Sequence, residues 1–173
     1  LALAQARLIF DQCRLTFPRL GFEIKIIKTT GDKKQAASLV QAGKSLPKGL
    51  FTKELEVALV KCKADLAVHS LKDLPTELPS GLTLGAVGKR EDVRDVLIYK
   101  TDAGLDGALP QLAEGAMVAT SSPRRQAQLL AARPDLQMQE IRGNLPTRLE
   151  KLADTDAMAG TVLAAAGLNR LDF

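Results

Sequence analysis

A lone carboxylate, Asp73, is the first residue in this chain whose type and position could do chemistry. It lies in the stretch ADLAVHSLKDLP (64–75), where the apolar run at 66–68 predicts a buried strand. The chain turns polar directly afterwards, at Ser70, Lys72 and Asp73. Open α/β sheets hold ligands at the carboxyl ends of their strands. One carboxylate among mostly cationic candidates suggests an anionic substrate that becomes locally positive during reaction, with a plain solvated turn as the alternative.

A second candidate site begins with the motif SSPRR (121–125), which follows an apolar run. Ser122 suits the N-cap of a helix and Pro123 suits its first position. The unpaired amides of a first helical turn and the helix dipole favour a bound anion. Arg124 and Arg125 oppose the usual preference for acidic residues in that turn. A bound carboxylate or phosphate therefore explains the two arginines better than helix stability does.

Arginine follows a predicted strand twice more in the second half of the chain. Arg142 follows the predicted strand 136–141, with Arg148 in the next helix, and Arg170 follows the predicted strand 157–165. The planar fork of a guanidinium matches the two oxygens of a carboxylate. Together with Lys72 and the serines at 121 and 122, these arginines predict a site for a ligand with several carboxylates.

The elements that must position these residues alternate between helices and strands. In the first half, apolar spacing predicts helices over 1–15 and 51–62, the second with Thr52 as its N-cap. Alternating apolar residues predict further strands over 22–29 and 82–87. In the second half, the predicted strands and helices cover residues 96–99, 116–120, 123–132, 136–141, 145–152 and 157–165.

These elements predict an α/β protein with two lobes of mixed sheet and flanking helices, residues 1–90 and 91–173, facing one cleft. The segment 35–49 lacks a clear period and carries Lys44 and Lys48. It is predicted to be a mobile basic loop over the site, with an ordinary surface loop as the alternative.

Composition narrows the class of protein. The 173 residues are 46% hydrophobic and 25% charged, which is typical of a globular domain. Without an apolar run of about 20 residues or a signal sequence, the chain is expected to be cytoplasmic and not attached to a membrane. We also expect a monomer. Cys13 and Cys62 lack a CxxC motif and His69 is the only histidine, so no metal site is predicted.

Charge leaves a nucleic-acid partner open but does not favour it. Residues 1–88 carry 13 Lys and Arg against 8 Asp and Glu, whereas residues 89–173 carry 11 against 12. Aromatic residues make up only 3% of the chain, and the arginines occur singly or in one pair rather than as a stripe. We therefore expect no nucleic-acid partner.

Six segments, taken together, resemble the porphobilinogen deaminase family, also called hydroxymethylbilane synthases. They are TTGD (29–32), GLFTKELEVAL (49–59), VHSLKDLP (68–75), ATSSPRRQAQL (119–129), IRGNLPTRLEKL (141–152) and AAAGLNRL (164–171). The resemblance covers nearly the whole chain in order. It implies two lobes like those of type II periplasmic binding proteins, and an enzyme of tetrapyrrole (haem) biosynthesis that joins four porphobilinogen units head to tail, releasing ammonia, onto a dipyrromethane cofactor.

The resemblance also implies roles for individual residues. Asp73, assisted by Lys72, would be catalytic and would stabilise the azafulvenium-like cation formed as ammonia leaves. Lys44 and Lys48 would lie on or beside a loop over the cleft. The residues expected to hold the carboxylates of cofactor and substrate are Ser70, Lys72, Thr120, Ser121, Ser122, Arg124, Arg125, Arg142, Gly143, Arg148 and Arg170.

Three departures from the family pattern stand out. The family's first strand is expected to be missing, as is the third domain with the cysteine that attaches the cofactor. Pro123 replaces the leucine of the family's SSLRR pattern and should be tolerated at a helix start. The missing cysteine favours an alternative hypothesis for this chain, a non-catalytic module that binds polycarboxylates or tetrapyrrole precursors.

Overall fold

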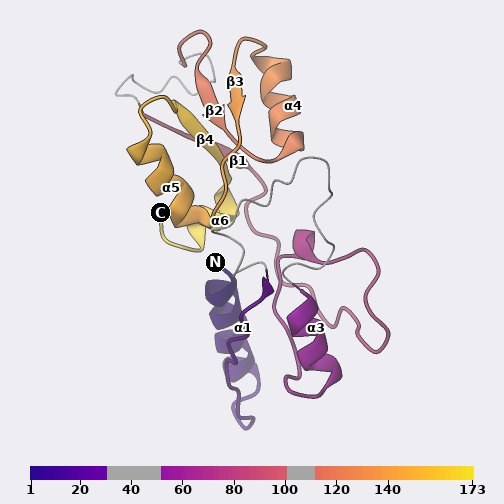
Figure 1. Cartoon of the computed structure of the whole chain (residues 1–173). Helices are drawn as coiled ribbons and strands as arrows, with labels where there is room; N and C mark the ends of the chain where they lie inside the picture. Colours follow the sequence, from indigo (N-terminus) through magenta and orange to yellow (C-terminus); the bar gives the residue numbers. More distant parts are fainter. Residues whose placement is uncertain (31–51, 101–111) are drawn as a thin grey trace. The chain divides into compact units, whose positions relative to one another are not determined.

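The computed structural model describes residues 1–30, 52–100 and 112–173, and the chain forms two compact units, Leu1–Lys89 and Arg90–Phe173. Figure 1 shows the elements of each unit. In the part of the chain that is described, no helix is both long and apolar enough to cross a membrane. The segment with Lys44 and Lys48 lies outside the described residues.

The first unit contains two of the predicted helices. They are α1 (Ala2–Thr16) and α3 (Lys53–Val60), and Thr52 is the N-cap of α3 as predicted, although its side chain makes no capping hydrogen bond. The apolar face predicted for α1 is not covered, because Leu8 is 51% exposed and Leu15 is 83% exposed. The apolar spacing therefore predicted the helix correctly, but the described residues do not bury its apolar face.

The strands predicted in the first unit are wrong. Residues 22–29, 66–68 and 82–87 have no strand assignment, and Leu66 is 57% exposed rather than buried. A strand requires a neighbour whose backbone N–H and C=O groups complete its ladder. None of the described segments of this unit supplies that neighbour, so apolar alternation alone did not make a sheet here.

The second unit is built on a four-stranded mixed sheet. Its strands are β1 (Asp95–Tyr99), β2 (Met117–Ala119), β3 (Gln137–Gln139) and β4 (Gly160–Ala164), in the order β1-β4-β2-β3. All four were predicted, with longer bounds for β2, β3 and β4. β4, β2 and β3 run parallel, and β1 is antiparallel to β4. The α/β class and the mixed sheet are therefore confirmed.

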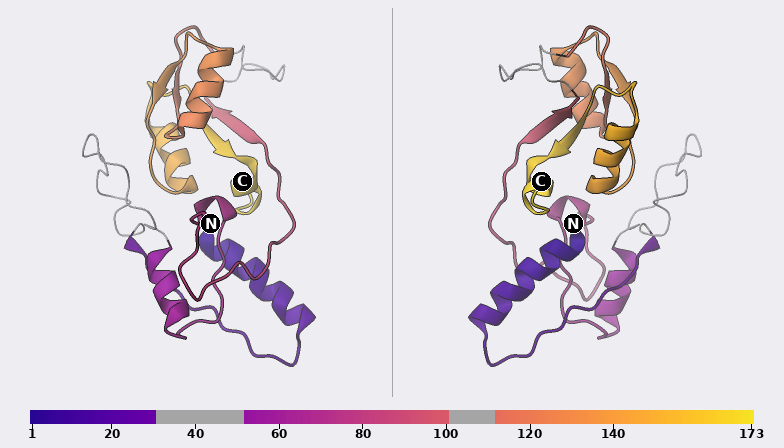
Figure 2. Two further views of the ribbon diagram at one scale, coloured as in Figure 1. Left: turned by 90° about the vertical axis from the view of Figure 1, so that its right-hand side faces the viewer. Right: turned by 90° about the vertical axis from the view of Figure 1, so that its left-hand side faces the viewer.

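Helices cover both faces of this sheet. Successive residues of a strand point to opposite faces, and in β2 Val118 packs in one core cluster with Leu129 of α4 (Pro123–Ala132), whereas Ala119 packs in another with Leu152 of α5 (Leu145–Asp154). Figure 2 shows the two helices on either side of the strands. Burying each leucine contributes about 1.5–3 kcal/mol. A short helix that was not predicted, α6 (Ala165–Asn169), follows β4 directly.

Candidate functional site

The sheet of the second unit brings four chain segments to one edge. Because β2, β3 and β4 are parallel, their carboxyl ends meet there, followed by Thr120, Glu140 and Ala165 respectively. β1 is antiparallel and pairs Asp95 with Ala164, so β1 contributes its amino end to the same edge. The predicted arginines of the second unit follow the three parallel strands, and Asp95 joins them from the fourth.

The residues that follow β2 connect the carboxyl ends of β2 and β3. The Ser121 hydroxyl donates to the carbonyl of Ile141 over 2.7 Å and accepts from the Ile141 N–H over 3.1 Å, which joins the ends of β2 and β3. Thr120 is 1% exposed, and its Oγ1 accepts from the Ser122 N–H over 3.2 Å. Ser122 is the N-cap of α4 as predicted, without a side-chain capping bond, and Pro123 is near the start of that helix. These contacts are structural, and ligand contacts of the three residues stay predictions.

Arg124 and Arg125 share one carboxylate of the protein itself. Arg125 Nη2 lies 2.6 Å from Asp95 Oδ1, and Arg124 Nη2 lies 2.8 Å from Asp95 Oδ2. Arg125 Nη1 also donates to the carbonyl of Val162 over 3.2 Å. Only 12% of the Arg125 side chain is exposed, against 60% for Arg124. The hydrogen bond from Arg125, with a smaller contribution from Arg124, lowers the pKa of Asp95.

Asp95 is a residue that sequence reasoning missed. The sequence argument attributed the two first-turn arginines to a bound anion, whereas the anion beside them in the structure is the Asp95 carboxylate. The only signal was an acidic residue directly before the predicted strand 96–99. Its place beside the arginines depends on the antiparallel pairing of β1 with β4, which the sequence alone did not predict.

The loop after β3 is held by side chains of α5. Arg148 Nε donates to the carbonyl of Gly143 over 2.9 Å, and Lys151 Nζ donates to the carbonyl of Arg142 over 2.9 Å. The φ angle of Gly143 is 122°, which favours glycine. Asn144 caps α5 by accepting from a backbone N–H. Side chains of α5 therefore hold the backbone of this loop at Arg142 and at Gly143.

Several donors at this edge lack acceptors within the described residues. The Nε atoms of Arg125 and Arg142 are buried and have no hydrogen-bond partner there. Burial lowers the pKa of Arg148, and the positive charge of Arg125 lowers it further. A buried donor without a partner costs about 1–3 kcal/mol. An anionic ligand with acceptor oxygens would relieve both the missing hydrogen bonds and the repulsion between the arginines.

Arg170 lies at the C-cap of α6 and is half-buried. Its side chain makes no hydrogen bond or ion pair with the described residues, and its role in ligand binding stays a prediction. Arg142 differs, since its Nη2 lies 3.3 Å from Glu140 Oε2.

The predicted residues of the first unit lie in or directly before a short 3-10 helix, η1 (Leu71–Asp73). Ser70 is its N-cap and donates through Oγ to Gln5 Oε1 over 3.1 Å. Lys72 and Asp73 are exposed. The polar turn after 66–68 is thus present without the strand that was expected to precede it, and the catalytic role of Asp73 stays a prediction.

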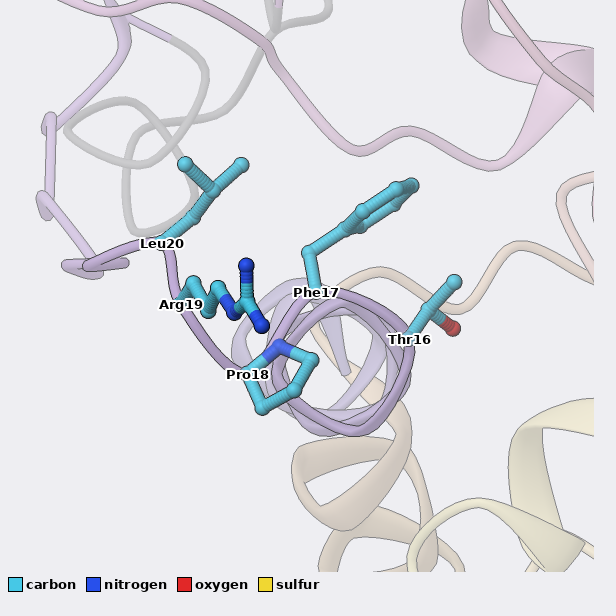
Figure 3. Close-up of a pocket in the computed structure, with 5 residues that line it drawn as sticks. All are labelled: Thr16, Phe17, Pro18, Arg19 and Leu20. Carbon is cyan, nitrogen blue, oxygen red and sulfur yellow. The ribbon is translucent and has the colours of Figure 1, made fainter.

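A hollow at the end of α1 does not involve the candidate site. Figure 3 shows its lining, which is one consecutive stretch of chain: Thr16, Phe17, Pro18, Arg19 and Leu20. None of the five is a predicted site residue. Within residues 1–30, 52–100 and 112–173, no group of three or more histidine, cysteine or acidic side chains is arranged to hold a metal ion.

Comparisons with known proteins match the whole chain. The family model described as "Porphobilinogen deaminase, dipyromethane cofactor binding domain" matches residues 1–173. The porphobilinogen deaminase of Desulforamulus reducens is 49% identical over 173 residues, which is 100% of this chain and 53% of that protein. That of Desulforudis audaxviator is 52% identical over 171 residues, 99% of this chain and 53% of that protein. The chain spans about half the length of these curated relatives.

Proposed function

Because the chain belongs to the porphobilinogen deaminase family, we propose that it supplies two lobes of a transferase that joins four porphobilinogen units head to tail and releases ammonia. This reaction builds hydroxymethylbilane in tetrapyrrole biosynthesis. The observation that supports the proposal best is the cationic sheet edge of the second unit, where the buried Nε atoms of Arg125 and Arg142 have no hydrogen-bond partner among the described residues.

The chemistry of that edge fits a dipyrromethane cofactor and its pyrrole substrate, since both carry acetate and propionate side chains. Guanidinium forks bind such carboxylates through charge-assisted hydrogen bonds. When bound, dipyrromethane would supply the pyrrole to which the first substrate unit is joined. In this proposal the residues that hold carboxylates are Ser70, Lys72, Thr120, Ser121, Ser122, Arg124, Arg125, Arg142, Gly143, Arg148 and Arg170.

Asp73 is proposed to act on the charge that develops in the substrate. Loss of ammonia from porphobilinogen leaves an azafulvenium-like cation, and a fixed carboxylate beside the pyrrole nitrogen stabilises that cation. The same carboxylate can accept a proton from the ring when the new carbon–carbon bond has formed. Lys72, next to Asp73 on η1, is proposed to assist by holding a substrate carboxylate.

The finer features of the organisation belong to the same proposal. We infer two lobes arranged like those of type II periplasmic binding proteins, with residues 1–90 and 91–173 facing one cleft that holds Asp73 on one side and the arginines on the other. The protein is further proposed to be a cytoplasmic monomer that does not bind nucleic acid.

The test is porphobilinogen consumption and ammonia release by the protein that carries this chain, compared with its Asp73→Asn and Glu77→Gln variants. Glu77 is a nearby exposed carboxylate and serves as the control. Removing one preorganised charge costs about a hundredfold to a thousandfold in rate, so Asp73→Asn should bind porphobilinogen yet lose that much kcat, while Glu77→Gln should keep it.

Each outcome separates the hypotheses. Near-normal turnover by Asp73→Asn would refute the role of Asp73. Binding of porphobilinogen by the unaltered protein without consumption would instead support the non-catalytic binding module.

A further inference from the structure

The two first-turn arginines of α4 converge on a single carboxylate. Successive residues of a helix do not face each other, because they project about 100° apart around its axis. Arg124 and Arg125 nevertheless place their Nη2 atoms 2.8 Å and 2.6 Å from the two oxygens of Asp95. The helix alone does not explain this convergence, whereas a carboxylate that bridges the two guanidinium groups does.

Asp95 is well placed to fix the position of both arginines. It is the first residue of β1 and pairs with Ala164 of β4, and the adjacent carbonyl of Arg94 accepts from the Ala165 N–H over 3.0 Å. Arg125 is anchored a second time, through the carbonyl of Val162. The arginine pair is therefore attached to two strands rather than to a loop, which limits how far the guanidinium groups can move.

Asp95 also balances the charge of the edge. Arg125 lies close enough to Arg148 for its positive charge to lower the pKa of Arg148. Without Asp95, Arg124, Arg125 and Arg148 would be like charges with no acidic partner among the described residues. Like charges separate where a side chain can reach solvent, and Arg124 is already 60% exposed.

We propose that Asp95 is a positioning residue, which holds Arg124 and Arg125 together so that both present donors to the carboxylates of one ligand. The ligand chemistry rests on the proposed function, but the effect of Asp95 on the arginines does not. In the opposite role, the Asp95 carboxylate would compete with the ligand for the same donors. The two roles predict opposite signs for the change in affinity.

The first experiment measures kcat and KM for porphobilinogen in the protein carrying Asp95→Asn, Asp95→Glu or Asp92→Asn. Asp92 forms a comparable ion pair with Arg94 in the same segment, 2.6 Å long, and is the matched control. Misplaced binding groups cost up to about a hundredfold. We expect Asp95→Asn to raise KM by about tenfold to a hundredfold with a smaller effect on kcat, Asp95→Glu to restore part of the loss, and Asp92→Asn to match the unaltered protein.

The second experiment does not need activity. The unliganded proteins are treated with phenylglyoxal, which modifies accessible guanidinium groups, and the rates at Arg124 and Arg125 are followed by mass spectrometry. Only 12% of the Arg125 side chain is exposed while Asp95 and Val162 hold its guanidinium. If Asp95 holds it in place, Asp95→Asn should release the guanidinium and raise its modification rate severalfold. Asp92→Asn should leave that rate unchanged.

The outcomes decide between the roles. A lower KM in Asp95→Asn would overturn the proposal in favour of competition. Unchanged KM together with unchanged labelling would overturn it in favour of a purely structural ion pair. If the unaltered protein does not consume porphobilinogen, the proposed function fails while the labelling still tests Asp95. If Asp95→Asn does not fold, the same two measurements are made on Asp95→Glu. An unaltered KM and an unaltered labelling rate in Asp95→Glu would contradict the proposal that Asp95 holds the two arginines in one fixed position.

Discussion

Replacing Gly143 with alanine should damage the loop that carries Arg142 more than its small size suggests. The φ angle of Gly143 is 122°, and an added Cβ would lie 2.8 Å from Thr147 Cγ2 and 3.0 Å from Thr147 Cβ. The 2.8 Å distance is shorter than real Cβ contacts and the 3.0 Å distance is tighter than most of them, so either the loop or the first turn of α5 must move. The carbonyl of Gly143 accepts from Arg148 Nε, so the movement reaches the candidate site.

The magnitude follows from two separate contributions. A non-glycine residue in a sparsely populated backbone region costs about 1–3 kcal/mol. Forcing an extra methyl group into an occupied space costs about another 1–3 kcal/mol. Gly115 separates the two contributions, since its φ is also positive, at 70°, but an added Cβ would meet only Gln137 Nε2, at 3.9 Å. Gly115→Ala therefore carries a backbone cost without the steric one, and that backbone cost is smaller than the one at Gly143, because a φ of 70° lies near the left-handed region that other residues sometimes adopt.

The assay is the melting temperature of the protein carrying each substitution, measured by scanning calorimetry. In a chain of this length, 1 kcal/mol corresponds to about 2–4 °C, so Gly143→Ala should melt several degrees below Gly115→Ala. Thr147→Ser removes the nearest carbon yet keeps the hydroxyl that donates to Asn144 Oδ1 over 2.8 Å. In the Thr147→Ser protein, Gly143→Ala should lower the free energy of unfolding by about 1 kcal/mol less than in the unaltered protein, because residues in contact have non-additive effects on stability. Equal melting temperatures for the two alanine variants would refute the steric argument.

Two further predictions concern the sheet. Ser121→Ala should cost about 1–2 kcal/mol, because the Ile141 N–H and carbonyl lose their shared partner, whereas Ser122→Ala, which removes no capping hydrogen bond, should leave the melting temperature within about 1 °C. Asp135→Asn should lower the melting temperature at pH 7, since hydrogen bonds from Arg133 and then from the Gly115 N–H hold the pKa of Asp135 well below its usual range. The carboxylate stabilises the fold above the unfolded pKa of about 3.9 and loses this effect as the pH falls through the lowered folded pKa. The difference in melting temperature should therefore be constant from pH 7 to about pH 5 and shrink below about pH 4, and a difference that persists undiminished at pH 2 would contradict the ionic origin.

The second unit was predictable from sequence because its local signals agree with its tertiary contacts. Pro123 marks the start of α4, and the apolar residues of β2 and β4 become the buried centre of the sheet. Each apolar run there has neighbours that complete its hydrogen bonds and helices that cover it. The local sequence pattern and the long-range strand pairing therefore favour the same strands and helices in this unit.

The first unit shows what local pattern lacks. Residues 22–29 alternate as a half-buried strand should, yet alternation specifies only which side chains share a face and not which segment lies beside the backbone. Without a ladder partner in the described part of the unit, Ile26 is 73% exposed. The helices of the same unit formed as predicted because each helix satisfies its backbone hydrogen bonds within itself.

The same distinction explains which residues at the carboxyl ends of the strands could be predicted from sequence. Arg124, Arg125, Arg142 and Arg148 were identifiable because each follows a parallel strand or begins a helix, and parallel strands always bring their carboxyl ends to one edge. Asp95 begins a strand, and it reaches that edge only because β1 is antiparallel to β4. In a mixed sheet, a complete account of a ligand edge therefore needs the residues that begin antiparallel strands as well as those that end parallel ones. An acidic residue at such a start can pair with cationic residues of a helix terminus, as Asp95 pairs with Arg124 and Arg125, and then belongs to the same electrostatic unit.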